Sequence, residues 1–178
     1  MTSHKNTYDV IVIGAGASGM MAAGRAAERG KRVLLLEKNR MLGKKLSISG
    51  GGRCNITNAE EDTDKLLAHY DKAKAFLHSP FSRFGMKDTF GFFESRGLKL
   101  KIEKNKRAFP ASDSATDVVR ALREYMAKGK VEVRTGMCVE HIYGSSGRIE
   151  KVVAGGEAFF ATSYILATGG AAHPETGS

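Results

Sequence analysis

The sequence predicts an α/β fold built on a doubly wound parallel sheet, and three observations support this prediction. An apolar run at 8–13 leads into the glycine-rich turn 14–19, and an alanine-rich stretch at 17–29 has the composition of a helix. A second apolar run at 32–36 follows and ends in an acid. The order strand, glycine turn, helix, strand is typical of the first unit of such a sheet.

The glycine turn has the pattern G-x-G-x-x-G, in which each glycine has its own physical role. Gly14 allows the tight turn out of the strand, and Gly16 allows the backbone to approach a pyrophosphate closely. Gly19 lets the helix pack on the strand, while the N–H groups at the helix start face the phosphates. The pattern alone is weak, but with strands and helix in register it predicts a Rossmann-like dinucleotide site.

The acid at the end of the second apolar run is Glu37. It follows the first glycine at roughly the offset of 20 residues that is typical of this unit. Its carboxylate can accept hydrogen bonds from both hydroxyls of an adenosine ribose. It would repel a 2′-phosphate, so an NADP-type ligand is disfavoured at this site.

Composition limits the classes of protein that the chain can belong to. Its 178 residues are 42% hydrophobic and 26% charged, which suits one globular domain or slightly more. No stretch approaches the roughly 18 to 20 apolar residues of a membrane span, and segment 1–7 lacks the apolar core of a signal peptide. We therefore expect a cytoplasmic protein with no membrane partner. Cys54 and Cys138 form no C-x-x-C pattern and no ligand pattern with the histidines, so no metal site is expected.

The net charge of +9 includes one basic concentration, in which Glu103 is the only acid. Its members are Lys99, Lys101, Lys104, Lys106 and Arg107. Such a segment can attract phosphates, RNA or an acidic partner, or it can be a solvated or covered face. Because no aromatic residues are interleaved with the lysines, the second interpretation is favoured, and a nucleic-acid partner is not expected.

The rest of the chain predicts further elements around this unit. A polar, glycine-rich loop at 38–60 precedes a helical insertion at about 62–97, whose aromatic residues we assign mainly to the core. Leu98, Leu100 and Ile102 alternate with lysines, as in a half-buried strand over 98–109. A helix at 113–128 stops at Gly129. Five strands are predicted to follow, at 131–135, 137–143, 148–154, 157–161 and 164–167. The middle ones form an antiparallel β-meander inserted at about 137–161.

Two more segments have the character of ligand loops. Segment 47–58 contains three consecutive glycines, which leave backbone N–H groups open to an anion or a flat ring. Within it Arg53 could pair with a phosphate, and Asn55 could bind the edge of a heterocycle. The alternative is a flexible surface loop. Segment 165–170 is a strand that ends in small residues, which would let a nucleotide pass the carboxyl edge of the sheet.

The residues resemble those of a known family. The glycine turn with Glu37, the Ser49–Asn55 loop, Phe109–Asp113 and the Ala167–Gly170 ending resemble, in the same order, the HI0933-like flavoproteins. This family is also called YhiN-like or BaiN-like, and some members are aminoacetone oxidases. The chain departs from it at 106–108, where relatives carry glycine-arginine before the Phe-Pro pair.

The resemblance implies FAD as the cofactor and assigns roles by position. The residues of the pyrophosphate turn are Gly14, Gly16, Ala17, Ser18 and Gly19. Glu37 would hold the ribose, with Lys38 beside it. The path towards the flavin would be lined by Lys45, Ser49, Gly51, Gly52, Arg53 and Asn55. Val139 resembles the position whose backbone meets the adenine, and the cofactor would be closed over by Ala167, Thr168 and Gly169. No catalytic residue is assigned. Cys54 follows Arg53, whose charge could lower a thiol pKa, but a loop-packing cysteine is the commoner case.

The function that this resemblance implies is that of an FAD-binding oxidoreductase. A small-molecule substrate or a nicotinamide donor such as NAD(P)H would pass a hydride to the flavin. Family members continue well beyond Ser178, so the resemblance implies that the chain is truncated. Residues 1–178 would be the N-terminal part of a two-dinucleotide-binding-type FAD domain, without the C-terminal half. Two alternatives remain open, a flavoprotein of tRNA modification and a non-catalytic nucleotide-binding module.

Overall fold

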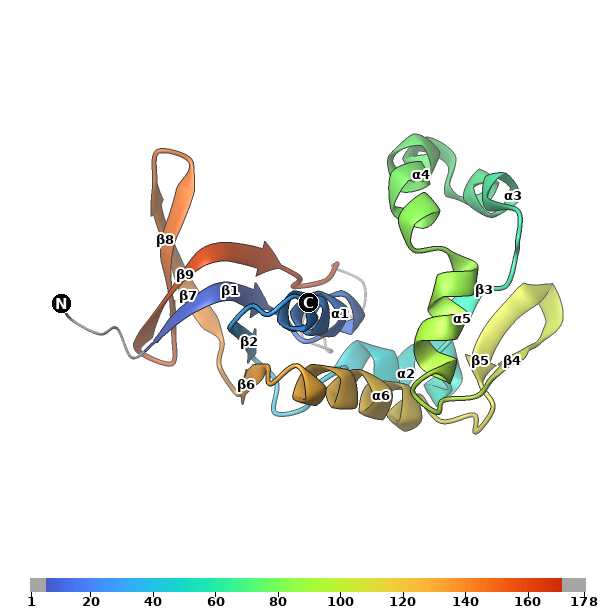
Figure 1. Ribbon diagram of the computed structural model, residues 1–178, viewed down its shortest axis with the longest axis horizontal. Coiled ribbons are helices and arrows are strands. Elements are labelled where there is room, and N and C mark those ends of the chain that lie inside the picture. Colours follow the sequence, from blue (N-terminus) through green and yellow to red (C-terminus); the bar gives the residue numbers. More distant parts are fainter. Residues whose placement is uncertain (1–5, 171–178) are drawn as a thin grey trace. The chain divides into compact units, whose positions relative to one another are not determined.

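The computed structural model describes residues 6–170 of the chain (Figure 1). The expectations for the amino-terminal segment and for the carboxyl end fall partly on residues 1–5 and 171–178, which lie outside the described residues. The chain divides into two compact units. The first unit contains residues 1–46 and 122–178, and the second unit contains residues 47–121. Each is described by itself below.

The first unit is built on a six-stranded sheet with the strand order β6-β2-β1-β9-β8-β7. Its strands are β1 (Thr7–Ile13), β2 (Val33–Glu37), β6 (Glu132–Thr135), β7 (Val139–Ser145), β8 (Arg148–Ala154) and β9 (Glu157–Leu166). The four strands β6, β2, β1 and β9 are parallel, whereas β7 and β8 are antiparallel to their neighbours. The predicted parallel sheet and its antiparallel meander are thus confirmed.

Strand β9 belongs to both parts of this sheet. Its first residues pair antiparallel with β8, from Ala154 opposite Glu157 to Val152 opposite Phe159. The following residues run parallel to β1, and Figure 1 shows β9 in red beside β1 in blue. The sequence predicted two strands, at 157–161 and 164–167, and this division is wrong. No glycine or proline interrupts the segment, so one strand of ten residues spans it.

Two helices supply the helical part of the first unit. Helix α1 (Ala17–Glu28) connects β1 to β2, and the second half of α6 (Ala115–Lys128) leads into β6. The two helices approach closely at Gly24, where a Cβ would overlap the ring of Tyr125. The Tyr125 hydroxyl donates a 2.9 Å hydrogen bond to Glu28 on α1. Helix α6 ends directly before Gly129, as predicted. These contacts fix α1 and the glycine turn that precedes it.

The second unit contains short helices and a three-stranded antiparallel sheet of order β3-β5-β4. Helix α2 (Lys44–Gly52) begins in the first unit and ends in the second. The other elements are β3 (Thr57–Asn58), α3 (Thr63–Leu67), the 3-10 helix η1 (Ala68–Ala73), α4 (Lys74–Arg83), α5 (Met86–Glu94), β4 (Leu100–Ile102), the 3-10 turn η2 (Lys104–Lys106) and β5 (Arg107–Pro110). The region 62–97 is therefore largely helical.

Three predictions for the second unit are wrong in detail. The single strand predicted at 98–109 is a hairpin of β4 and β5, turned by Asn105 and Lys106 at φ of 60° and 57°. Ile102 lies at the end of β4 beside this turn and is 59% exposed rather than half-buried. The predicted loop 38–60 contains the helical start of α2. The aromatic residues are only partly core, because Phe93 is buried whereas Phe76 on α4 is 78% exposed.

Candidate cofactor site

The glycine turn after β1 is interlocked with the end of β9. Gly14 has a φ of 100°, and a Cβ there would overlap the carbonyl oxygen of Ala167. A Cβ at Gly19 would overlap the carbonyl oxygen of Gly14. Ala167 in turn donates a 2.8 Å backbone hydrogen bond to Ile13. The protein's own backbone therefore requires glycine at positions 14 and 19. This agrees with the roles predicted for Gly14 in the turn and for Gly19 in helix packing.

Gly16 differs from the other two glycines of the motif. Its φ of −75° and ψ of −171° are open to any residue. Apart from its chain neighbours, no heavy atom of the described residues lies within 4 Å of a Cβ built there. Nothing in the described part of the fold requires a glycine at this position. The space in front of it is the cradle that a pyrophosphate needs, so the turn fits the predicted group.

The start of α1 completes this cradle. Gly16 is the N-cap residue, and its carbonyl accepts the first helical hydrogen bond from Met20 at 3.0 Å. Ala17 and Ser18 are exposed in the first turn, where backbone N–H groups have no partner within the helix. Together with the positive end of the helix dipole, these N–H groups make the turn suitable for an anion.

The carboxylate of Glu37 lies buried beside the same turn, with an exposed fraction of 7%. One oxygen accepts a 2.7 Å hydrogen bond from the backbone N–H of Ala15. The other accepts from the backbone and the side chain of Asn39, at 2.8 and 2.7 Å. Because two carboxylate oxygens offer about four acceptor positions, Glu37 keeps capacity for a ribose hydroxyl. Lys38 beside it is exposed.

The other predicted residues of the first unit gather around the ends of β1, β2 and β9. The segment after β6 follows the end of β2, since Met137 donates a 2.8 Å backbone hydrogen bond to Glu37. Val139 begins β7 nearby and packs against the core of the sheet. The Lys45 ammonium donates a 3.1 Å hydrogen bond to the carbonyl of Gly170, next to Thr168 and Gly169. Sequence reasoning missed Asn39, for which the pattern gave no signal.

The glycine loop of the second unit, residues 49–55, has an unusual backbone. The helical part of α2 ends at Ser49, whose ψ is 150°, and Gly50, Gly51 and Gly52 then have φ of 58°, 69° and 84°. A Cβ at Gly50 would lie 2.8 Å from the backbone nitrogen of Asn55 and 2.9 Å from the ring of Phe109. Gly51 is exposed, and no heavy atom of the described residues, apart from its chain neighbours, lies within 4 Å of a Cβ built there. Gly51 is thus the position in this loop most open to a ligand.

Arg53 is engaged with its own unit. Its guanidinium donates hydrogen bonds to Glu103 at 2.8 Å and to Asp113 at 3.3 Å, and it lies 4.1 Å from the ring centre of Phe109. The bond from Arg53 lowers the pKa of Glu103, and a 2.5 Å bond from Lys101 lowers that of Asp113. The sequence predicted Arg53 as a partner of a phosphate, whereas here two carboxylates already accept from it.

Cys54 faces inwards, and the exposed Asn55 binds backbone carbonyls of its own unit. The Cys54 thiol is 1% exposed, and burial raises its pKa above the usual value. Burial opposes thiolate formation, which agrees with the loop-packing interpretation and not with a nucleophile. With its amide oriented to satisfy its neighbours, Asn55 donates to the carbonyls of Thr57 and Ala108 at 3.1 and 3.2 Å. These contacts fasten the loop to β3 and β5.

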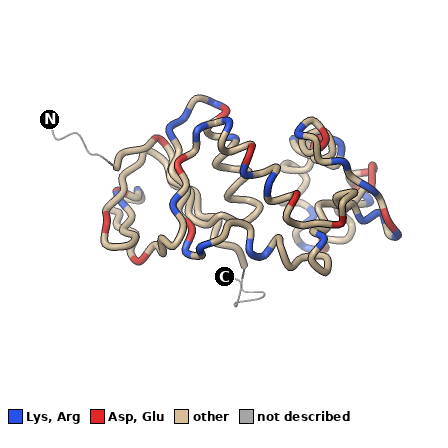
Figure 2. Tube along the Cα trace, turned by 90° about the horizontal axis from the view of Figure 1, so that it is seen from below, with Lys and Arg blue, Asp and Glu red and all other residues tan. Residues whose placement is uncertain are grey.

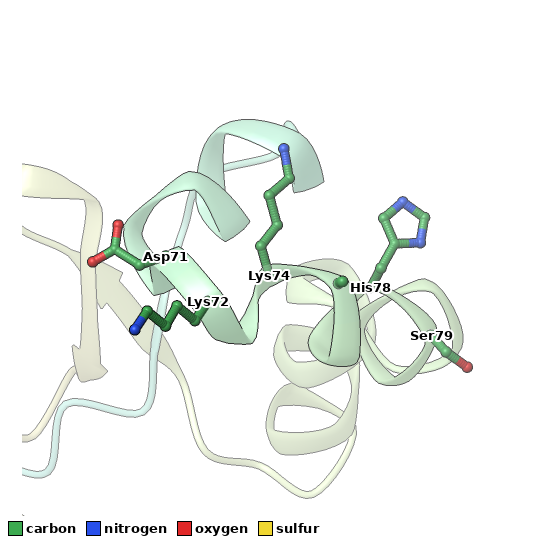
Figure 3. A pocket seen from close by; sticks show the side chains of 6 residues that line it. Asp71, Lys72, Lys74, His78 and Ser79 are labelled. Atoms are coloured by element: carbon green, nitrogen blue, oxygen red, sulfur yellow. The ribbon is translucent and has the colours of Figure 1, made fainter.

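A separate hollow of about 620 Å³ lies on the helical part of the second unit. Its lining includes Asp71, Lys72, Lys74, His78 and Ser79. Figure 3 shows that these side chains do not converge on a common centre, because Asp71 and Lys72 extend to one side, Lys74 points upwards and His78 and Ser79 lie on the other side. Within residues 6–170, no cluster of three or more histidine, cysteine or acidic residues could hold a metal ion. The hollow therefore has no converging set of ligands.

The model of the HI0933-like protein Rossmann domain matches residues 8–178. The chain belongs to this family. A curated relative from Clostridium scindens, 3-dehydro-bile acid delta(4,6)-reductase, is 35% identical over 94% of this chain and 40% of its own length. The ribosomal RNA dihydrouridine synthase of Escherichia coli is 35% identical over 71% of this chain and 31% of its own length. The chain thus spans less than half the length of these HI0933-like relatives.

Solved structures share the fold at low identity. A 3-ketosteroid-delta4-(5alpha)-dehydrogenase from Rhodococcus jostii has a TM-score of 0.70 and 17% identity, and covers 95% of this chain and 47% of its own. A flavocytochrome c3 fumarate reductase has a TM-score of 0.63 and 22% identity, over 94% of this chain and 34% of its own. The HI0933-like domain is thus confirmed as a Rossmann-type fold, and FAD is its cofactor.

Proposed function

We propose that this HI0933-like chain is the FAD-holding part of an oxidoreductase that acts on a carbon–carbon double bond conjugated to a carbonyl. Gly16 is the observation that carries the FAD part of the proposal, because this open glycine with ordinary φ stands at the N-terminus of α1 within the glycine turn, where a side chain would occupy the space of a bound pyrophosphate. The buried carboxylate of Glu37 beside the same turn supports a ribose at the adjoining position.

The substrate class is inferred from the chemistry in the relatives' names. A 3-dehydro-delta(4,6) bile acid has a ring ketone conjugated to double bonds, and the relative from C. scindens is its reductase. Dihydrouridine differs from uridine by saturation of a ring double bond that is conjugated to a carbonyl. These two substrates differ in size and charge but share the reacting group. We therefore assign this chain's enzyme an enone-like acceptor.

FAD supplies hydride transfer when it is bound, and the chain's own residues supply placement. We assign the pyrophosphate to the turn Gly14–Gly19, whose N–H groups and missing side chains admit it. Glu37 accepts from the ribose, and the family resemblance assigns Gly51 and Gly52 to the path towards the flavin. The reductant of the enzyme is a nicotinamide donor, and the cytoplasm is its location.

A second candidate, reduction of a base in RNA, is favoured by the two relatives named ribosomal RNA dihydrouridine synthase, from E. coli and Haemophilus influenzae. The basic segment 99–107 gives it limited support. Lys101 pairs with Asp113, and Lys106 pairs with Glu60 at 2.6 Å. Figure 2 shows acidic residues interleaved with basic ones along the trace. Binding of rRNA fragments at low salt, lost steeply as salt rises, would favour this candidate.

The test of the FAD assignment compares two glycines. Gly16 and Gly91 both have ordinary φ and no described neighbour within 4 Å of a built Cβ, but Gly91 lies on helix α5, outside the glycine turn. FAD is added to purified chain, and retained flavin absorbance is measured after desalting. We expect the wild type and Gly91→Ala to retain flavin and Gly16→Ala to lose it without a large loss of thermal stability. Equal retention by both variants would contradict the assignment.

A further inference from the structure

Arg53 joins three segments of the second unit that are far apart in sequence. It comes from the glycine loop, while Glu103 lies between β4 and the turn η2 and Asp113 lies before α6. Its guanidinium donates to both carboxylates. Lys101 on β4 binds the same two acids, at 3.6 Å from Glu103 and 2.5 Å from Asp113. We call these four residues the Arg53 cluster.

Phe109 connects the Arg53 cluster to the glycines. Its ring is 1% exposed and is covered on one face by the guanidinium of Arg53, at 4.1 Å from the ring centre. At the ring edge, a Cβ on Gly50 would lie only 2.9 Å from the ring carbon. The loop therefore bends around the ring, with Gly50 at its edge and Arg53 over its face. A guanidinium in this place contributes both cation–π attraction and packing.

The charges within the Arg53 cluster balance. Two cations face two anions, so the cluster presents no excess positive charge to an approaching phosphate. The side chains are about one-third exposed, so water screens their attraction. The cluster is therefore suited to fixing geometry, and poorly suited to attracting an anion over a distance.

We propose that Glu103 and Asp113 are positioning residues that act through Arg53 to hold Gly50 against Phe109, and with it the turn Gly50–Gly52. The held conformation is the left-handed backbone at Gly51, a residue that the family resemblance assigns to the path towards the flavin. Arg53 then serves the site by fastening the loop, and not as a phosphate ligand. The part of this inference that concerns FAD rests on the proposed function. The fastening of the loop by Arg53 does not depend on it.

The direction in which FAD affinity changes in two variants distinguishes fastening of the loop by Arg53 from direct binding of a phosphate by Arg53. The double variant Glu103→Gln with Asp113→Asn releases the Arg53 side chain from its two carboxylates but keeps its positive charge. Arg53→Ala removes both the contacts of this side chain and its charge. If Arg53 fastens the loop, both variants weaken FAD binding, by about fivefold to tenfold, as expected for loss of charge-assisted hydrogen bonds. If Arg53 binds a phosphate, the double variant binds FAD more tightly than wild type, and this result would overturn the proposal.

The matched control is the double variant Glu61→Gln with Asp64→Asn. It makes the same change of charge in the same unit, at exposed acids that pair with Lys87 and Lys74. We expect it to bind FAD as wild type does. If Arg53→Ala does not fold, Arg53→Lys replaces it, because lysine keeps the charge but lacks the planar group that covers Phe109.

A second measurement does not depend on FAD. Amide hydrogen exchange at Gly50–Gly52, measured without cofactor, should be several-fold faster in Arg53→Ala and in the Glu103/Asp113 variant than in wild type and control. Unchanged exchange in both would overturn the proposal. If wild type binds no FAD but exchange rises as expected, the proposed function fails and the fastening stands.

Discussion

Glu37 accepts a 2.7 Å hydrogen bond from the backbone N–H of Ala15, so the acid at the end of β2 holds the glycine turn at the end of β1. This contact gives the carboxylate a structural role besides its expected role at the ribose. The two backbones also meet directly, since Gly14 donates a 2.8 Å hydrogen bond to Leu36. The geometry of the turn is thus set by β2 before any ligand arrives.

Glu37→Gln should therefore destabilise the protein even without FAD. The amide replaces one acceptor oxygen by an N–H₂ group, which would face donors that now bind the carboxylate. We expect the free energy of unfolding to fall by about 1 to 3 kcal/mol, the usual cost of a buried unsatisfied group. Urea denaturation of the cofactor-free protein measures it. Glu140→Gln, at an exposed position of β7, is the control, and equal stability of the two variants would contradict the role assigned to Glu37.

Alanine at Gly19 should destabilise the protein far more than alanine at Gly16. At Gly19 the new Cβ would overlap the backbone of Gly14, so the strand and helix must separate, at a cost of about 1 to 3 kcal/mol or more. At Gly16 the native φ is open to alanine, whose gain through the unfolded chain opposes its weaker preference for the N-cap position, so stability should change by less than about 1 kcal/mol. Thermal unfolding of both variants without FAD checks the two effects. A loss at Gly16 equal to that at Gly19 would refute the distinction.

The Arg53 cluster should make stability depend on pH in the acid range. The bond from Arg53 lowers the pKa of Glu103, and that from Lys101 lowers the pKa of Asp113. Their stabilisation is fully present above the unfolded pKa values of about 4, and is lost as pH falls through the lower folded values. Melting temperatures between pH 6 and 3 should fall less steeply in the Glu103→Gln, Asp113→Asn variant. An equally steep fall would contradict this prediction.

The two cysteines should differ strongly in reactivity. Cys54 is buried and its thiol pKa is raised by burial, whereas Cys138 is exposed. A thiol reagent at pH 8 should modify Cys138 quickly and Cys54 only when the protein unfolds. Cys138→Ser should remove the fast phase and leave the slow one. A fast phase that survives this substitution would show that the loop around Cys54 opens readily.

The first unit could be predicted well because its signals are local. The apolar runs, Gly14, Gly19 and Glu37 lie close together in sequence, and each has a steric or hydrogen-bonding reason to be where it is. Of the residues predicted for the cofactor site in this unit, the structure brings the turn, Glu37 and Ala167 together. Whether they contact FAD stays a prediction.

The second unit was harder to predict because its organisation depends on distant contacts. Arg53 meets Glu103 and Asp113, which are 50 and 60 residues away, and no pattern around Arg53 points to either. The one signal was Glu103 itself, an acid within a basic run. The hairpin was missed because Asn105 and Lys106 adopt left-handed φ without a glycine. Alternation of Leu100 and Ile102 with lysines suits an exposed hairpin as well as a half-buried strand.

The pairing of β1 with β9 has a consequence for synthesis of the chain. Thr7 lies opposite Phe160 and Ile13 lies opposite Leu166, so β1 and its neighbour β9 are separated by most of the described sequence. Contacts of such long sequence separation close slowly, because a large loop must be ordered first. On the ribosome, β1 therefore keeps one edge unpaired until residue 166 has emerged. During that interval the nascent chain needs protection of the β1 edge against pairing with other strands.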